Sequence, residues 1–375
     1  MRVLHLGKFY PPVKGGMETM LELMCEYTSS QIENSVICAN DRCALNEERR
    51  GSTDVIRLPA IARIGAVAVC PTMPWRLARA DADLIVLHEP NPMALLAYFL
   101  ARPSTTLLVW FHSEVIRPSW RYKLFYRPFL QFALRRAARI VATSPTLAAS
   151  SPVLTPWHDK CVVIPFGIDE RAPSEQVLQR AAAVREAEAR PIVLFVGRLV
   201  PYKGVDVLLE AMRAIPAVAL LVGEGPEGPA LRQSAEALGV ADRVRFLGEV
   251  SNDELAALYR ACDLLVLPSV TRQEAFGVVL LEAMACGKPV VSTDLGTGTG
   301  WVNQDRETGF VVAPRDPAAL HEAISRLVAE PELRELLGDG ARRRARSLFA
   351  LDRMIESILA LYRQASDTKL DGRAA

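Results

Sequence analysis

The sequence has no run of eighteen apolar residues, so no segment of it is apolar and long enough to cross a bilayer as a helix. It also has almost no excess charge. A formal net charge of +1 argues against a molecule that binds polyanions over its whole surface, so any basic feature must be local. The opening stretch, MRVLHLGKFYPP, has an apolar core too short for a signal peptide and runs into prolines.

The spacing of the cysteines is not that of a metal site. The seven cysteines form no C-x-x-C pair, and their number is odd. Such usage indicates reduced, buried thiols and a cytoplasmic protein.

What the sequence does have is length and apolar content. A chain of 375 residues, half of them hydrophobic, predicts two domains with large cores. Apolar strands that do not alternate with polar residues are joined by amphipathic helices, which indicates parallel sheets covered on both faces. The expected strands are 2–7, 34–39, 54–59, 83–89, 105–112, 139–144 and 161–167 in the first set, and 191–199, 218–225, 243–250, 263–269, 288–294 and 309–314 in the second.

This pattern predicts an α/β fold of two Rossmann-like domains. We place the first domain at 1–172 and the second at 173–350, with a charged, Ala-rich linker and a short helix between the two strand sets. Residues 351–375 are expected to form a C-terminal helix that packs back on the first domain and ends in a frayed tail. In open α/β domains the strand ends carry the ligand sites, so we expect a site in a central cleft that the two sheets face.

Two cations follow the first strand of the second domain. In FVGRLVPYKG, Arg198 and Lys203 stand just before a helix, where helix amides and cations together suit a diphosphate. Two ordinary surface cations on a loop are an equally good explanation.

Glycines follow the next strand in the order G-x-G-x-x-G, at Gly223, Gly225 and Gly228. A dinucleotide site needs an acidic residue at the end of the following strand, and Asp242 precedes that strand. We therefore interpret the glycines as a tight turn where backbone approaches a nucleotide, with a plain strand-to-helix turn as the alternative.

Two carboxylates frame EAFGVVLLE. Glu274 is expected in a loop, and Glu282 inside a helix that runs from about Gly277 to Cys286, so the two do not share a helix face. The amides near the helix start would point between them at an anionic group, and each carboxylate would bind hydroxyls. The alternative is one capping carboxylate and one solvated glutamate.

Taken in order, these motifs resemble the retaining glycosyltransferases of family four, which have the GT-B fold. The resemblance covers residues 1 to about 350. It is carried by R-x4-K, E-x7-E, the glycine-rich YPPVKGGMET and the strand end WFHSE. The matching residues are Gly15, Gly16, Glu18, His112, Arg198, Lys203, Gly223, Gly225, Ser269, Glu274 and Glu282.

The resemblance implies a role for each residue. Arg198 and Lys203 would hold the diphosphate of a nucleotide-sugar and stabilise the charge that grows on the leaving group. Glu282 would bind the ribose and Glu274 the donor sugar. The remaining donor-site residues would be Gly16, Gly223, Gly225, Ser269 and the amides of Phe276, Gly277 and Val278.

On the other domain, the resemblance implies that His112 contacts the sugar near its reacting carbon. Gly15 and Gly16 would let backbone approach phosphate and acceptor without a side-chain clash. For Glu18 an acceptor contact and a helix cap are equally good explanations, and His112 alone could be a structural histidine.

The implied reaction retains anomeric configuration. It needs no metal and no other cofactor, because Arg and Lys neutralise the diphosphate. A glycoside hydrolase would require carboxylates facing each other across the scissile bond. A nucleotide-sugar epimerase, a phosphorylase and a catalytically silent membrane scaffold are the competing interpretations.

Residues 117–139 carry seven cations, six aromatics and no acid. We favour an interfacial helix on anionic lipid over a core helix with solvated arginines; a nucleic-acid patch is less favoured, and no nucleic-acid partner is expected. The residues proposed to face the membrane are Arg117, Trp120, Arg121, Lys123 and Arg127. The protein would then be cytoplasmic and peripheral on the inner membrane surface.

The loop after residue 294 reads LGTGTGWVN where many family members have a Gly-Gly pair and an acidic residue. This version is similar to bacterial mannosyl- and rhamnosyltransferases that build surface polysaccharide on a lipid carrier. The expected donor is GDP-mannose, with a UDP-sugar or a deoxyhexose donor as alternatives, and the expected acceptor is a lipid-linked saccharide.

Overall fold

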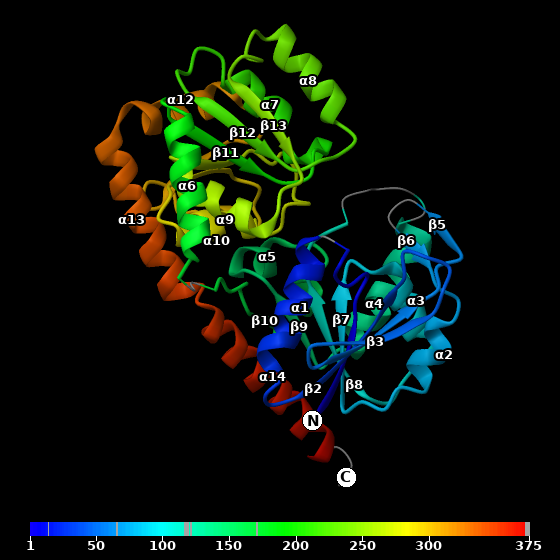
Figure 1. Cartoon of the computed structure of the whole chain (residues 1–375). Coiled ribbons are helices and arrows are strands. Elements are labelled where there is room, and N and C mark those ends of the chain that lie inside the picture. Colours follow the sequence, from blue (N-terminus) through cyan, green and yellow to red (C-terminus); the bar gives the residue numbers. More distant parts are fainter. Residues whose placement is uncertain (14, 65–66, 116–119, 121, 170–171, 372–375) are drawn as a thin grey trace. The chain divides into compact units, whose positions relative to one another are not determined.

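A computed structural model describes residues 1–13, 15–64, 67–115, 120, 122–169 and 172–371. The chain divides into two compact units (Figure 1). Unit one comprises Met1–Phe166 and Asp352–Ala375, and unit two comprises Gly167–Leu351. The main boundary therefore falls at Phe166, just before the position expected from the sequence.

Unit one is built on an eight-stranded sheet with the order β10-β9-β8-β7-β1-β2-β4-β3. Its strands are β1 (Arg2–Leu6), β2 (Glu33–Ala39), β3 (Asn46–Arg50), β4 (Thr53–Leu58), β7 (Leu84–Glu89), β8 (Thr106–Phe111), β9 (Arg139–Ala142) and β10 (Cys161–Val163). All pair in parallel except β3, which runs antiparallel to β4 at the edge. A separate hairpin joins β5 (Ala62–Ile64) to β6 (Val67–Val69).

The central strands of this sheet are buried on both faces, as their unbroken apolar runs predict. The helices of unit one are α1 (Gly16–Thr28), α2 (Met73–Ala78), α3 (Pro92–Ala101), α4 (Arg127–Arg136) and α5 (Pro145–Ser150), with a π-helical turn at Tyr122–Tyr126 and a 3-10 turn at Thr155–Lys160. The sequence did not predict β3, because its letters NEERR carry no apolar signal. Charged side chains are common on such an edge strand, where they discourage pairing with another chain.

Unit two has a six-stranded, fully parallel sheet with the order β13-β12-β11-β14-β15-β16. Its strands are β11 (Ile192–Val196), β12 (Val218–Val222), β13 (Val244–Gly248), β14 (Leu264–Leu267), β15 (Val290–Thr293) and β16 (Gly309–Val312). Its helices are α6 (Glu175–Ala187), α7 (Val205–Ala211), α8 (Gly228–Ala237), α9 (Asn252–Ala261), α10 (Val278–Ala285), α11 (Thr299–Val302), α12 (Pro317–Ala329) and α13 (Pro331–Leu348).

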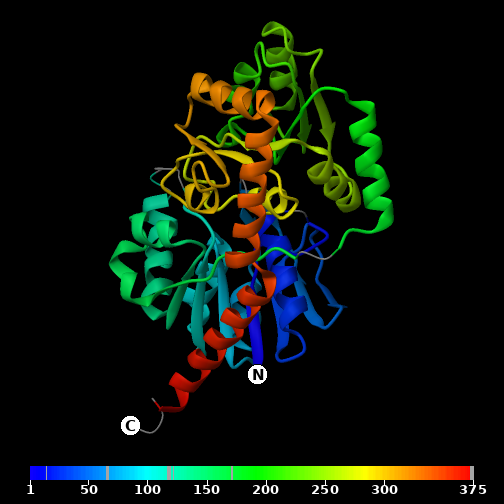
Figure 2. The same ribbon diagram turned by 90° about the vertical axis from the view of Figure 1, so that its left-hand side faces the viewer.

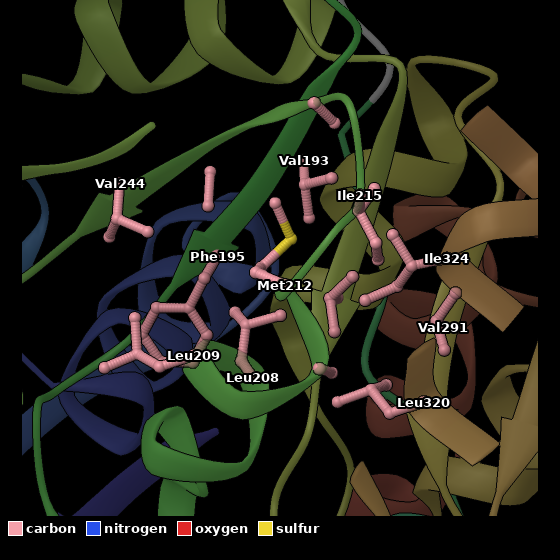
Figure 3. Packing of buried hydrophobic residues seen from close by; sticks show 14 of the residues in the cluster. Val193, Phe195, Leu208, Leu209, Met212, Ile215, Val244, Val291, Leu320 and Ile324 are labelled. Carbon is pink, nitrogen blue, oxygen red and sulfur yellow. The ribbon is translucent and has the colours of Figure 1, made fainter. Parts of the chain in front are cut away.

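The core of unit two lies between its sheet and the helices α7, α8 and α12. Figure 3 shows Phe195 of β11 and Leu208 and Leu209 of α7 pointing into this cluster, with Ile324 entering from α12. All four side chains are fully buried. Burying side chains of this size stabilises the fold by about 1.5–3 kcal/mol each. This core therefore holds the strands of unit two, and the loops that follow them, in fixed positions.

In both sheets the strand order reverses next to the first strand. The chain leaves β11 toward β12 on one side and returns to β14 on the other, and it does the same around β1, between β2 and β7. Ligands of open α/β sheets bind outside the carboxyl ends of the strands at such a reversal. The loops after β11 and β14, and those after β1 and β7, are therefore the first places to look for a site.

The C-terminal helix α14 (Leu351–Asp371) belongs to unit one from Asp352 onward. Tyr362 lies against the His5 ring of β1, and Ser366 donates to the sulfur of Met1 at 3.0 Å. Figure 2 shows this helix beside the N-terminus. None of the helices in the described part of the chain has the length and apolarity that a membrane crossing requires.

Candidate functional site

An ion pair lies at the strand-order reversal of unit two. Lys203 Nζ, in the turn after β11, is 2.5 Å from Glu274 Oε2, in the loop after β14. Ser269 Oγ donates to the same carboxylate oxygen at 3.0 Å. Only about a tenth of either charged side chain is exposed. Glu274 thus contacts two other residues that the sequence placed in the same site.

The charges around Lys203 keep it protonated. Burial lowers its pKa, but the Glu274 carboxylate outweighs this effect, so the pKa lies above its ordinary value. Arg198 is exposed at the end of β11, and it is near enough for its charge to act on Lys203. A second cation beside a neutralised pair leaves a net positive group, which suits a diphosphate.

Glycines let two backbone segments, the turns after β11 and β12, pack closely against each other. At Gly223 (φ +118°) a Cβ would collide with the carbonyl of Gly197, and at Gly225 with the carbonyl of Leu199. Glu224, between them, accepts the Leu199 amide at 2.9 Å. Gly223 and Gly225 pack against the backbone of Gly197 and Leu199, on either side of Arg198. They therefore fix the turn that carries Arg198.

The helix after Glu274 begins where the sequence predicts. Helix α10 spans Val278–Ala285, with Gly277 at its N-cap in the left-handed region (φ +80°). A Cβ at Gly277 would come within 2.8 Å of Leu267. The first amides of a helix have no partner within it, so those at Val278 and its neighbour are available to an anion. Phe276 is buried beside the N-cap.

Glu282 has a partner of its own, different from those of the ion pair. It lies inside α10, and the phenol of Tyr259 on α9 donates to its Oε2. Burial raises the pKa of this carboxyl, and the Tyr259 hydrogen bond only partly counters the rise. The sequence did not predict Tyr259, because nothing in the spacing of α9 links it to α10.

The glycine- and threonine-rich loop after β15 supports the Glu274 segment. Thr297 Oγ1 donates to the backbone carbonyl of Glu274 at 2.7 Å, and the amide of Gly298 donates to that of Ala275 at 2.7 Å. Thr293, at the end of β15, donates to the carbonyl of Ser269 at 2.5 Å. This loop therefore lies next to the predicted sugar-binding loop and sets its backbone.

In unit one, the glycine-rich loop leads from β1 into α1. Gly15 is the N-cap, and a Cβ there would collide with the carboxylate of Glu18. No described atom lies within 4 Å of the Cβ position of Gly16, which is exposed. Glu18 is buried in the first turn, and burial raises its pKa. No side-chain cap bond is formed at this N-cap.

His112 lies directly after β8 and is buried. Its ring stacks on Phe166 at a centroid distance of 5.7 Å. Its Nε2 is 2.9 Å from Nδ1 of His88, at the end of β7. Burial lowers the pKa of His112 to about 3, so the ring is neutral at physiological pH.

The residue after His88 is a buried carboxyl that no sequence motif singles out. Glu89 ends β7 and accepts the phenol of Tyr126 and the amide of Asn91, the latter at 3.2 Å. Its backbone carbonyl accepts the His112 amide at 2.9 Å. Burial raises the pKa of Glu89 to about 8.

The basic and aromatic segment has two kinds of position. Tyr126 and Leu130 are buried, whereas Trp120 and Leu124 are 64% and 63% exposed, and Arg127 is exposed as well. Of the other residues predicted to face a membrane, Arg117 and Arg121 lie outside the described residues, and the side chain of Lys123 is not described.

A D-x-D sequence occurs at Asp81–Asp83, but it lies at the amino end of β7, away from the strand ends discussed above. Both carboxylates pair with Arg2, and Asp83 Oδ2 accepts the Arg2 amide at 2.8 Å. Within the described residues, His, Cys, Asp and Glu side chains form no cluster of three or more that could hold a metal ion.

Comparison with known proteins agrees with this geometry. A family model described as glycosyl transferases group 1 matches residues 179–344, and one described as a glycosyl transferase 4-like domain matches residues 15–167. The chain is 35% identical over 353 residues to the D-rhamnosyltransferase WbpZ of Pseudomonas aeruginosa, with 93% of this chain and 92% of that protein covered. It is 31% identical over 384 residues to the O-antigen chain mannosyltransferase C of Escherichia coli, with 98% and 100% covered.

Among solved structures, the sucrose-phosphate synthase of Thermosynechococcus elongatus superposes with a TM-score of 0.81 at 24% identity, covering 97% of this chain and 98% of that one. Two α/β units with parallel sheets, together with this likeness, define a GT-B fold. The chain belongs to the group 1 glycosyl transferases, the family that the ordered motifs predict.

Proposed function

We propose that the chain is a retaining hexosyltransferase that uses a nucleotide-diphospho-sugar without a metal ion. The observation that carries the proposal is the Lys203–Glu274 pair beside Arg198 at the strand-order reversal of unit two. In this scheme the two cations bind the diphosphate and stabilise the charge that develops on the leaving group. The α10 amides bind the same phosphates.

The carboxylates have separate tasks in this proposal. Glu274 accepts hydroxyls of the donor sugar, and its position is set by Lys203, Ser269 and the Thr297 loop. Glu282 accepts the ribose hydroxyls with the oxygen that Tyr259 leaves available. In unit one, His112 contacts the sugar near its reacting carbon.

GDP-mannose is the proposed donor, and a rhamnose donor or a UDP-sugar is the alternative. The relatives support a mannosyl or rhamnosyl group, since one is named as an O-antigen chain mannosyltransferase and the other as a D-rhamnosyltransferase. The proposed acceptor is a lipid-linked saccharide of bacterial surface polysaccharide. A position on the inner membrane surface follows from such an acceptor and from the exposed Trp120, Leu124 and Arg127.

A ligand screen followed by a transfer assay tests this function. The full-length chain is heated with GDP, UDP, dTDP and their sugars, and we expect GDP and GDP-mannose to raise Tm the most, because stabilisation follows occupancy. Transfer to a lipid-linked acceptor is then followed with EDTA present, and the anomeric configuration of the product is read by NMR. Inversion of configuration, or loss of transfer in EDTA, would contradict the mechanism. A larger increase in Tm with UDP than with GDP would mean that the donor is a UDP-sugar instead of GDP-mannose.

A further inference from the structure

A row of buried polar side chains crosses four neighbouring strands of unit one. Asn34 on β2 pairs in register with Val3, two residues before His5 on β1. His5 pairs with Val86, two residues before His88, and His88 pairs with Trp110, two residues before His112. Side chains two apart on a strand share a face of the sheet. The row therefore advances diagonally over one face toward the carboxyl edge.

The members of this row are connected end to end. His5 Nε2 lies 3.3 Å from Asn34 Oδ1, and His5 Nδ1 lies 3.1 Å from His88 Nε2. His88 Nδ1 lies 2.9 Å from His112 Nε2. All four side chains are at most 5% exposed. The last atom, His112 Nδ1, is buried and has no hydrogen-bond partner among the described residues.

The donor and the acceptor of every hydrogen bond in the row follow from the orientation of the Asn34 amide. The Asn34 amide nitrogen is 3.0 Å from the carbonyl of Cys25, which can only accept, so this nitrogen must donate. It also lies 2.9 Å from the Thr28 hydroxyl, whose own proton goes to the carbonyl of Met24. Asn34 Oδ1 is consequently an acceptor, and His5 Nε2 must carry the proton that faces it.

This assignment propagates along the row. A neutral imidazole with its proton on Nε2 accepts at Nδ1, so His5 accepts from His88, and His88 in turn accepts from His112. The opposite direction would place two acceptors, His5 Nε2 and Asn34 Oδ1, against each other. Burial lowers the pKa of His5 to about 4, which agrees with neutral rings.

We propose that Asn34, His5 and His88 are positioning residues that hold His112 in the Nε2–H tautomer, so that Nδ1 accepts a hydrogen bond from a sugar hydroxyl of the substrate. The proposal rests on the proposed function for the identity of the ligand, but not for the tautomer. The row does not conduct protons, because Asn34 cannot take up the proton that would leave the far end. A donated hydrogen bond at Nε2 also makes the opposite nitrogen a better acceptor.

Nitrogen NMR of the full-length chain labelled with 15N-histidine tests the tautomer directly. The chain has five histidines, and one of them is an internal reference. His321 Nδ1 lies 2.8 Å from the carbonyl of Ala211, so His321 must carry its proton on Nδ1. We expect His5, His88 and His112 to show the opposite pattern, with an unprotonated Nδ1. A protonated Nδ1 on His112 would overturn the proposal.

Two substitutions of His88 test the effect on the substrate. His88→Asn can place its amide oxygen near the position of the ring Nδ1 and keep an acceptor for His112, whereas His88→Leu removes it. We expect His112 in His88→Leu to populate both tautomers and kcat/KM for the donor to fall about ten-fold. His88→Asn should stay within about three-fold of wild type, and both variants should bind the free nucleotide as wild type does.

Wild-type spectra and kinetics in His88→Leu would show that the row does not position His112 and would overturn the proposal. If the wild-type chain transfers no sugar from any nucleotide, the proposed function fails instead, and the spectra still decide the tautomer. If His88→Leu does not fold, the wild-type spectrum decides alone.

Discussion

Lys203 and Glu274 are two buried charges whose roles in stability and in transfer can be separated. Lys203→Met leaves the Glu274 carboxylate without its partner and removes one cation from the predicted diphosphate site. We expect kcat to fall about 10²- to 10³-fold, as for the loss of one preorganised charge, and the free energy of unfolding to fall by about 3 kcal/mol. Steady-state kinetics and urea unfolding measure the two effects.

The matched control is Arg326 of α12, which forms an exposed i,i+4 pair with Glu330, the residue directly after that helix. Exposed pairs of this kind contribute under about 1 kcal/mol, so Arg326→Met should change neither measurement appreciably. Full transfer activity in Lys203→Met would exclude the proposed mechanism, whatever happens to stability.

Glu89 predicts a pH-dependent stability. Its pKa is raised to about 8 in the folded chain by burial, against roughly 4.3 when unfolded. Its contribution is therefore fully present below about pH 4 and is lost as pH rises through 8. Glu89→Gln resembles the neutral carboxyl, so we expect it to equal wild type in stability at pH 4 and to be more stable by about 5 kcal/mol at pH 8.5, at about 1.36 kcal/mol for each unit of the pKa difference.

Urea unfolding at the two pH values measures this difference, and the exposed Glu33 supplies the control substitution Glu33→Gln. A Glu89→Gln variant that is less stable than wild type at pH 8.5 would mean that Glu89 is ionised and stabilising in the fold.

At the residue scale, the sequence predicts the contacts that follow a short motif and misses those that cross the sheet. The R-x4-K and E-x7-E spacings placed Lys203 and Glu274 in one site, and they form an ion pair. Tyr259 and His88 contact predicted residues, but each lies on a separate element, so their proximity depends on strand order and helix packing.

At the scale of elements, the turn after β12 offers a test of what its glycines do. A Cβ at Gly225 would collide with the Leu199 carbonyl, whereas at Gly228 the nearest described atom is 3.6 Å away, in ordinary contact. We expect Gly225→Ala to lower the free energy of unfolding by about 2 kcal/mol or more. Gly228→Ala, at the start of α8, should be neutral or stabilising by up to about 1 kcal/mol.

Thermal and urea unfolding compare the two variants. Equal stabilities would show that the turn relaxes around the added methyl group, and the close backbone packing would then not be the reason for a glycine at Gly225.

We expect the basic and aromatic segment that contains the exposed Trp120, Leu124 and Arg127 to bind anionic membranes. We expect Arg121, Lys123 and Arg127 changed together to Glu to lower binding to anionic vesicles by more than about 100-fold, since each basic residue near the surface contributes about 1 kcal/mol. Co-sedimentation with anionic and neutral vesicles measures it. Arg42→Glu, at an exposed position elsewhere in unit one, is the control, and unchanged binding in the triple variant would rule the surface out.

Element prediction succeeded where apolar runs were continuous. All the strands expected in the second domain are present, because buried parallel strands have a strong sequence signal. Charged β3 and the short hairpin of β5 and β6 were missed. Short edge elements depend on pairing with a neighbour rather than on burial, and that neighbour cannot be seen in the local sequence.

At the scale of the whole molecule, the order of strands brings distant residues together. His5 and His112 are far apart in the sequence, yet the order β8-β7-β1-β2 aligns them in one buried row. Alternation predicts which face of a strand a residue occupies, but a register between strands comes only from the assembled sheet. This is why the fold class could be predicted and the row could not.

The same row predicts that unit one is labile in acid. An unfolded histidine has a pKa of about 6.5, whereas burial lowers His5 to about 4, His112 to about 3 and His88 well below its usual value. The free energy of unfolding is therefore highest above pH 6.5 and decreases as the pH falls below it. The reason is that the unfolded chain then binds up to three more protons at these histidines than the folded chain does. Glu89 acts in the opposite direction, since the folded chain binds one more proton there between about pH 4.5 and 8.

The net difference approaches two protons near pH 5, so the free energy of unfolding of unit one should fall by roughly 2–3 kcal/mol per pH unit as the pH is lowered there. Urea unfolding at a series of pH values from 7 to 4.5 measures this slope. Hydrogen exchange of the amides in β1 and β7 over the same pH range shows whether unit one is the part that is destabilised. Glu89→Gln should make it steeper by one proton, and His158→Gln, at an exposed position, should leave it unchanged. A flat profile would mean that the folded row takes up as many protons as the unfolded chain, so that burial does not lower these pKa values.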